Sequence, residues 1–476
     1  MTLDEKIALQ KDKINRGNPT IELLGSCRIE NGIVSISDEK MKEAIHYHEQ
    51  KIKQLKVCFF IPSSGSGSRM FGAAYDFIEQ DAPSEETIEF IEHLINSIEE
   101  FAFYNKLPKH LKEELKSGTI NIEAFLKLIL NEEGFNFGNR PKGLIPFHRY
   151  GNFIINPFQE HILQGTQIGG EKARFHFTIN AVFESEIMHS IKILREITGL
   201  DFYFEFSVQD EATNSIAFTT TGEPLRDKNG QLITRPAGHG ALVENLNQID
   251  ADLIYIRNID NVQHQDHAEQ SAQSRKMLSG ALLQFQELVF TLLSLIDAGE
   301  PYEELLSELN LTYQLEIKPS DFGNSARIRA ILDRPIRICG MVRNEGQPGG
   351  GPFWVQSNGV ISKQIVEKSQ ISLKGEQYHL MAQSSHFNPV MIALSTKDLN
   401  GTKIDLTNYK DDNNYFIVHK KHYGVPIRFI ELPGLWNGGM AFWNTVFVEV
   451  PSESFSPVKS VLDLLEKGHQ TNYNVI

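Results

Sequence analysis

Several short polar segments of this 476-residue chain carry residue types that bind phosphate. The first, residues 63–70 (SSGSGSRM), directly follows the apolar run 57–62 (VCFFIP). Glycines let the backbone approach a ligand closely, and successive N–H groups at a helix start attract an anion. Arg69 adds a planar cation that suits phosphate. The spacing matches neither the dinucleotide fingerprint nor the lysine-containing phosphate loop, so a surface turn is the alternative interpretation.

Two lysines follow prolines closely. Lys142 stands in residues 140–147 (RPKGLIPF), and Lys459 stands in residues 455–459 (FSPVK), before a helical pattern. A lysine fixed beside proline can point into a cleft. Taken alone, each is better explained as a solvated lysine in a turn.

Two further loops have compositions that suit a base and a metal ion. Residues 235–242 (RPAGHGAL) place His239 between two glycines, where the backbone could pass along a flat base, although a single histidine is more often structural. Residues 255–262 (YIRNIDNV) end a buried strand pattern in Asn and Asp. Ligands of open α/β sheets bind beyond the carboxyl ends of strands, and Asp260 could hold Mg²⁺ there. A strand-end turn is the alternative for this cluster.

The elements that would position these loops follow an α/β pattern. Apolar runs predict strands, and periodic segments between them predict helices, an order typical of a mixed, mostly parallel sheet with helices on both faces. The predicted strands are 57–61, 174–179, 201–206 and 253–256, and the predicted helices include 184–197 and 240–249.

The same pattern predicts three regions. They are a helical N-terminal extension (1–54), a catalytic domain (55–450), and a C-terminal region (451–476) with Lys459 and a last helix over 461–467. Residues from about 81 to 133 are acidic and helical in spacing. They are interpreted as an insertion into the catalytic domain, with a separate helical domain as an equal alternative.

Composition limits the partners. The chain has 61 acidic and 46 basic residues, a net charge of −15, which argues against a nucleic-acid polymer as partner. Its three cysteines are far apart, so a reducing compartment fits. The polar start lacks a signal-peptide pattern, and no apolar run is expected to span a membrane. We expect a cytoplasmic protein without a membrane partner and leave its oligomeric state open.

The order of these segments resembles the UDP-sugar pyrophosphorylases, of the UDP-glucose and UDP-N-acetylglucosamine types, in the nucleotide-diphospho-sugar transferase superfamily. The resemblance runs from about residue 56 to residue 465. The matching segments are the Gly/Ser loop with Arg69, Lys142 after proline, 236–240 (PAGHG), 258–261 (NIDN), 364–371 (QIVEKSQI) and 455–459 (FSPVK). Any one of them is commonplace, but their order is specific.

Three segments depart from that pattern. The first is the Gly/Ser loop, in which Ser63 and Ser64 precede the glycines and Ser68 stands in place of threonine. Residues 340–354 (GMVRNEGQPGGGPFW) and 432–439 (LPGLWNGG) have no counterpart in those enzymes, which suggests a distinct bacterial branch. The departures leave the sugar open, and they also put the base in doubt.

The resemblance implies a GT-A-like Rossmann-type fold and a reaction of UTP with a sugar 1-phosphate, giving a UDP-sugar and pyrophosphate with Mg²⁺. Arg69, Lys142 and Lys459 would act on the phosphates, and Asp260 would hold Mg²⁺. Glu367 and Asn388 would contact sugar hydroxyls. The loop residues that would hold the nucleotide are Ser64, Gly65, Ser66, Gly67, Ser68, Gly238, His239 and Gly240.

Two alternatives belong to other functional classes. One is a glycosyltransferase of the same fold that uses a UDP-sugar donor, which would not need a loop for a triphosphate. The other is a nucleotide-sugar-binding protein without activity, for which loss of a phosphate-binding cation would be expected. Arg69, Lys142 and Lys459 are all present.

Overall fold

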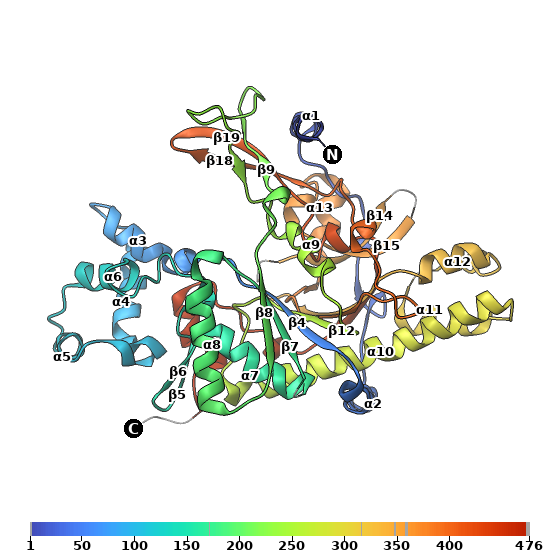
Figure 1. Ribbon diagram of the computed structural model, residues 1–476, viewed down its shortest axis with the longest axis horizontal. Helices are drawn as coiled ribbons and strands as arrows, with labels where there is room; N and C mark the ends of the chain where they lie inside the picture. The colour runs from blue at the N-terminus through green and yellow to red at the C-terminus, as the bar shows by residue number, and fades with distance from the viewer. Residues whose placement is uncertain (1, 171, 316, 347–348, 358–359, 473–476) are drawn as a thin grey trace. The chain divides into compact units, whose positions relative to one another are not determined.

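The computed structural model describes all residues except 1, 171, 316, 347–348, 358–359 and 473–476 (Figure 1). The chain divides into two compact units. Unit 1 comprises Met1–Cys58, Gln209–Ile256 and Ser274–Ser452, and unit 2 comprises Phe59–Val208, Arg257–Gln273 and Glu453–Ile476. Each unit is therefore built from segments that are distant in sequence.

Unit 2 contains the strands that precede and follow the Gly/Ser loop. Strands β4, β7 and β8 are neighbours in that order, and β7 pairs with β8 in parallel. The strands of this unit are β4 (Val57–Pro62, most of which lies here), β5 (His148–Tyr150), β6 (Phe153–Ile155), β7 (Arg174–Thr178) and β8 (Tyr203–Ser207). Its helices are α3 (Gly72–Glu79), α4 (Glu85–Asn96), α5 (Lys109–Ser117), α6 (Ile122–Leu130), α7 (Pro157–Gly169) and α8 (Glu184–Thr198).

Close packing fixes α7 on this small sheet. The rings of Phe59 and Phe175 stack with centroids 5.1 Å apart. A methyl group at Gly165 of α7 would lie 2.4 Å from Phe175, so only glycine lets the helix approach this closely. The helix itself begins with a capping box between Asn156 and Gln159.

The acidic segment 81–133 is helical, as α4, α5 and α6 show. Its apolar side chains share one core with residues that flank the predicted site segments. This core includes Leu94, Phe125 and Ile129 from the segment, and Phe71, Phe137, Ile145, Val262 and Val458 from its surroundings. The segment is therefore packed within unit 2 and is not a separate domain.

Unit 1 holds a mixed sheet. In the order β2-β3-β20-β13-β17-β12, the first four strands pair in parallel and the last two antiparallel. The strands of this sheet are β2 (Arg28–Ile29), β3 (Gly32–Val34), β12 (Leu253–Ile256), β13 (Ile336–Arg343), β17 (Ile392–Ser395) and β20 (Asn444–Glu449), with β16 (His386–Phe387) paired to β13.

Smaller sheets accompany it. One has the order β1-β14-β15, another β10-β19-β18, and β9 pairs with β11. Their strands are β1 (Leu23–Ser26), β9 (Ser215–Ile216), β10 (Phe218–Thr219), β11 (Thr234–Arg235), β14 (Gly351–Ser357), β15 (Val360–Val366), β18 (Phe416–His422) and β19 (Val425–Glu431). The helices are α1 (Leu3–Arg16), α2 (Asp38–Lys51), α9 (Leu242–Asn247), α10 (Glu269–Ala298, whose first turn belongs to unit 2), α11 (Glu303–Tyr313), α12 (Ser325–Leu332) and α13 (Gly375–Ala382).

The structure differs from the sequence-based expectations in three places. The last helix, expected over 461–467, is two short 3₁₀-helices, Val461–Leu465 and Lys467–His469. A Ser460–Asp463 capping box starts the first of them, but hydrogen bonds local to each turn replace a continuous α-helix. Residues 1–54 contain β1, β2 and β3 besides two helices, because β3 pairs with β20 in the main sheet of unit 1.

The third difference concerns α10. Among the described residues, α10 is the one helix that is long enough and apolar enough to cross a membrane. This is contrary to the expectation that no apolar run reaches that length. Within its most apolar stretch, 44% of the residues are buried in the protein. Leu282, Phe285 and Leu292 are among them, so these side chains serve as core.

Replacing Gly280 of α10 with alanine should destabilise the protein. The added methyl group would lie 1.8 Å from the carbonyl oxygen of Ala44 in α2, so the backbone must shift. Alanine is the better helix former by about 1 kcal/mol, but overpacking of this kind costs on the order of 1–3 kcal/mol or more. We expect a net fall in the free energy of unfolding, measured by urea denaturation.

Gly72→Ala is the matched control for Gly280→Ala. Gly72 is the first residue of α3, and a methyl group there meets nothing within 4 Å. It should leave stability unchanged or raise it slightly. Equal stabilities for both variants would contradict the close crossing of α2 and α10.

Candidate functional site

Three charged side chains meet in unit 2. The ammonium groups of Lys142 and Lys459 donate to the same carboxylate oxygen, Oδ2 of Asp260, at 3.0 Å and 2.9 Å. The side chains of Asp260 and Lys142 are only 9% and 13% exposed, whereas that of Lys459 is 56% exposed. Residues 118 and 199 positions from Asp260 in sequence therefore converge on one buried carboxylate.

The C-terminal segment, defined here as residues 453–472, is held against the segment that carries Asp260. The N–H of Val458 donates to the carbonyl of Asp260 at 3.0 Å, and Lys142 Nζ donates to the carbonyl of Val458 at 2.7 Å. Buried Arg257 adds a bond to the carbonyl of Ser454 at 3.2 Å. These contacts bring Lys459 to Asp260.

The Gly/Ser loop is tied to the stretch that carries Lys142. The N–H of Lys142 donates to the carbonyl of Gly65 at 3.0 Å, and that of Gly67 donates to the carbonyl of Arg140 at 2.8 Å. A methyl group at Gly67 would lie 2.4 Å from Ile145, so this glycine is needed for the approach. Gly65 and Asp260 thus lie on either side of Lys142, which contacts both.

The electrostatics of this cluster favour an anion. Burial lowers the pKa of Lys142; Asp260 raises it, while Lys459 and Arg69 lower it further. Burial alone would raise the pKa of Asp260, but the two ammonium groups hold that pKa below its usual value, so the carboxylate stays ionised. Arg69 is exposed in the turn after the loop. Three cations and one carboxylate leave a net positive charge where a polyphosphate could bind.

The residues present do not make a Mg²⁺ site by themselves. Magnesium takes several oxygen ligands, and here Oδ2 of Asp260 already accepts both ammonium groups. Within the described residues, no group of three or more His, Cys, Asp or Glu side chains could hold a metal ion. Asp260 as a metal ligand therefore stays a prediction.

The second group of predicted residues lies in unit 1, where Gly238, His239 and Gly240 pack on residues 432–439. The ring of His239 stacks on Trp436 with centroids 4.4 Å apart and planes 25° apart. The N–H of Leu435 donates to His239 Nδ1 at 3.1 Å. The segment noted in sequence for having no counterpart is thus the direct neighbour of the predicted base-binding loop.

Glu367 and Asn388 also lie in unit 1, close to Gly350. The N–H of Asn388 donates to the carbonyl of Gly350 at 2.9 Å, and a methyl group at Gly350 would lie 3.1 Å from Glu367 Oε1. Burial raises the pKa of Glu367, and a contact with Asn437 opposes this. Gln347 and Pro348 of the neighbouring Gly-rich stretch lie outside the described residues.

Sequence reasoning missed a buried polar cluster in unit 2. His148 contacts Glu160 Oε2 through Nδ1 at 2.8 Å and His469 Nδ1 through Nε2 at 3.0 Å, and the side chains of His148 and Glu160 are fully buried. Burial, followed by nearby His148, holds the pKa of His469 well below its ordinary value. The cluster fastens the C-terminal segment that carries Lys459. Single histidines spread over the chain gave no local signal for it.

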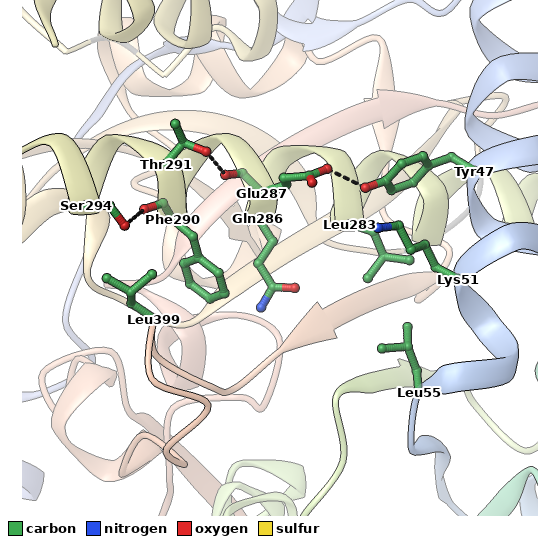
Figure 2. Close-up of a pocket in the computed structure, with 10 residues that line it drawn as sticks. All are labelled: Tyr47, Lys51, Leu55, Leu283, Gln286, Glu287, Phe290, Thr291, Ser294 and Leu399. Carbon is green, nitrogen blue, oxygen red and sulfur yellow. Dashed lines mark hydrogen bonds between the residues drawn. The ribbon is translucent and has the colours of Figure 1, made fainter.

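Figure 2 shows a different feature, an open cavity of about 380 Å³ between α2 and α10 in unit 1. Tyr47 donates a hydrogen bond to Glu287 at its edge. The other lining residues are Lys51, Leu55, Leu283, Gln286, Phe290, Thr291, Ser294 and Leu399. None of the residues predicted to bind a substrate lines this cavity.

The predicted residues thus form two groups. Arg69, Lys142, Asp260, Lys459 and the Gly/Ser loop belong to unit 2, and the Gly238–Gly240 loop, Glu367 and Asn388 belong to unit 1. Each group is assembled within its own unit.

Solved structures of other proteins are similar to this chain. The chain is similar to the uridine diphosphate N-acetylglucosamine pyrophosphorylase from Trypanosoma brucei, with a TM-score of 0.50 and 12% identity over 97% of this chain and 74% of that chain. It is also similar to a UDP-glucose phosphorylase from Trypanosoma brucei, with a TM-score of 0.43 and 12% identity over 97% of this chain and 74% of that chain. The first similarity establishes a mixed α/β fold with a central, mostly parallel sheet.

No curated protein matches the sequence. A family model described as domain of unknown function DUF4301 matches residues 2–470, nearly the whole chain. The chain therefore belongs to the DUF4301 family.

Proposed function

We propose that the chain is a nucleotidyltransferase of the UDP-sugar pyrophosphorylase type, which makes a UDP-sugar and pyrophosphate from UTP and a sugar 1-phosphate. The observation that carries this proposal is the meeting of Lys142 and Lys459 on Asp260 beside the Gly/Ser loop. The similarity of fold to a UDP-N-acetylglucosamine pyrophosphorylase supports it. A GT-A-like arrangement and a cytoplasmic location belong to the same proposal.

This chemistry requires positive charge and no general base. The phosphate group of the sugar 1-phosphate has a second pKa of about 6, so the attacking oxygen is largely ionised at neutral pH. It forms a bond to the α-phosphorus of UTP while the bond from that phosphorus to the bridging oxygen of pyrophosphate breaks. The protein must bring two anions together in line and neutralise the charge that develops on the leaving group.

The residues of unit 2 would supply that charge. The N–H groups of the Gly/Ser loop and Arg69 would hold the triphosphate, Lys142 would act at the reacting phosphates, and Lys459 would bind the sugar phosphate. Asp260 opposes the effect of burial on the pKa of Lys142 and holds both ammonium groups at one point before substrates bind. Mg²⁺ would enter only with the nucleotide, whose phosphates must provide most of its ligands.

The residues of unit 1 would recognise the rest of the substrates. The backbone at Gly238, His239 and Gly240 would face the base. Glu367 and Asn388 would hydrogen-bond to sugar hydroxyls.

The proposal is tested by incubating the protein with nucleoside triphosphates and sugar 1-phosphates in all combinations and measuring pyrophosphate release. We expect release with UTP and at least one hexose 1-phosphate, and none when either substrate is omitted. A protein that hydrolyses or transfers from UDP-sugars, but releases no pyrophosphate from any pair, is a glycosyltransferase instead. Binding of UDP-sugars without any turnover would favour the inactive binding protein.

Lys459→Ala should lower turnover by about a hundredfold to a thousandfold, the cost of losing one charge at a developing oxyanion. Its thermal stability should change little, because the lysine side chain is 56% exposed and Lys142 still compensates the charge of Asp260. Lys459→Arg should restore activity only in part, since the guanidinium is larger and planar.

Lys467→Ala is the matched control, because Lys467 is an exposed lysine of the same C-terminal segment. Steady-state rates of the three variants and their melting curves provide the measurement. Equal rates for Lys459→Ala and Lys467→Ala would remove Lys459 from the mechanism.

Asp260→Asn should keep the fold and lose most turnover, by about a hundredfold. Without the carboxylate, nothing offsets the burial that lowers the pKa of Lys142, so more of that lysine is neutral as the pH rises. The loss should therefore deepen from pH 6 to pH 9, as a pH–rate profile would show. Full activity of the variant, or of the parent protein in excess chelator, would contradict Asp260 as a metal ligand.

A further inference from the structure

Segment 432–439 fixes the ring of His239 in unit 1 from two directions. The backbone N–H of Leu435 donates to Nδ1 at 3.1 Å. The indole of Trp436 stacks on the imidazole, with centroids 4.4 Å apart. A hydrogen bond in the ring plane and a stack on its face together define one orientation of His239.

The glycines of both segments permit this contact. A methyl group at Gly434 would lie 2.7 Å from Cε1 and 2.9 Å from Nε2 of His239, and one at Gly240 would lie 2.2 Å from the carbonyl oxygen of Pro433. Real side-chain atoms do not approach this closely, so alanine at either position would force the loops apart. Glycine at positions 240 and 434 is therefore needed for the close contact between the two segments.

A buried arginine is hydrogen-bonded to the backbone of Trp436. Arg337 in β13 is fully buried, donates through Nε to Thr445 Oγ1 at 2.9 Å, and donates through Nη1 to the carbonyl of Trp436 at 2.6 Å. The turn is closed by Asn437 and Gly439, whose N–H groups both donate to the carbonyl of Gly434. The residue that stacks on His239 is therefore anchored in the main sheet of unit 1.

The hydrogen bond from Leu435 also determines where the proton of His239 lies. An N–H donor requires an acceptor, so Nδ1 must carry a lone pair and the ring proton must be on Nε2. We infer that segment 432–439 positions His239 as a neutral imidazole whose Nε2–H donates a hydrogen bond to an oxygen of the nucleotide. The identity of the ligand rests on the proposed function; the orientation and tautomer of His239 do not.

The surroundings of the ring are consistent with a neutral histidine. His239 is exposed at the surface, and desolvation of the packed part of its ring lowers its pKa below the usual value. Charged groups that contact the residues around the ring include Glu431 beside Gly238, Arg337 at the carbonyl of Trp436, and Glu367 at the side chain of Asn437. A neutral ring can accept the N–H of Leu435 at Nδ1 and donate from Nε2 at the same time.

Intrinsic fluorescence tests the positioning without any ligand. A protonated imidazole quenches an indole stacked on it, so a pH titration of the full-length protein reports the state of His239 through Trp436. We expect a quenching step well below pH 6.5 in the parent protein, absent from both His239→Gln and Trp436→Phe. A His239-dependent step at or above pH 6.5, or no such step, would overturn the inferred state of the ring.

Calorimetric binding of uridine and UMP tests the hydrogen bond. At pH 7, His239→Gln and Gly434→Ala should each weaken binding by about tenfold, the effect of one hydrogen bond. Gly323→Ala, where a methyl group meets nothing within 4 Å, should bind like the parent. A loss confined to UMP identifies a phosphate oxygen as the acceptor, and an equal loss with uridine identifies a carbonyl of the base.

The remaining outcomes separate this inference from the proposed function. Parent-like affinity of His239→Gln would show that the donor role is wrong, although the chain binds nucleotide. Loss of affinity in His239→Gln but not in Gly434→Ala would show that the segment does not position the ring. Absence of uridine and UMP binding by the parent protein would contradict the nucleotide ligand and the proposed function together.

Discussion

The ion pairs of Asp260 join the segments that form the candidate site of unit 2. A carboxylate this deeply buried is stable only when opposite charges compensate it, and here two ammonium groups share one of its oxygens. One lysine is hydrogen-bonded through its N–H to Gly65 of the Gly/Ser loop, and the other stands in the C-terminal segment. Loop, strand end and C-terminal segment are therefore joined at one point.

Part of this arrangement could be predicted from sequence and part could not. The apolar run 57–62 and the alternation around 174–207 predicted β4, β7 and β8, because strands rich in aromatic and β-branched residues leave strong local patterns. Lys459 carries no such pattern, since its neighbours form only 3₁₀ turns and its partner is 199 residues away in sequence. Only its place in an ordered series of motifs pointed to Asp260. The cluster of His148, Glu160 and His469 is formed by tertiary packing alone, so no local sequence pattern predicts it.

The predicted base loop packs against a segment outside the motifs that carry the resemblance. This segment is residues 432–439, whose Gly434 and Trp436 contact His239 closely. Arg337 is buried without a carboxylate among its hydrogen-bond partners in the described residues, and its bond to the carbonyl of Trp436 stabilises this loop. Burial of a cation is costly, so a structural benefit must offset it. We therefore expect unit 1 to determine which base and sugar are bound, and unit 2 to act on the phosphates.

We propose that the chain transfers a uridylyl group between pyrophosphate and a sugar phosphate. The reverse reaction tests it most directly: a UDP-sugar is incubated with radiolabelled pyrophosphate, and the nucleotides are separated. We predict label in UTP and release of sugar 1-phosphate, with both lost in Lys459→Ala. Formation of UDP and free sugar, with no label in UTP for any UDP-sugar offered, would contradict the account.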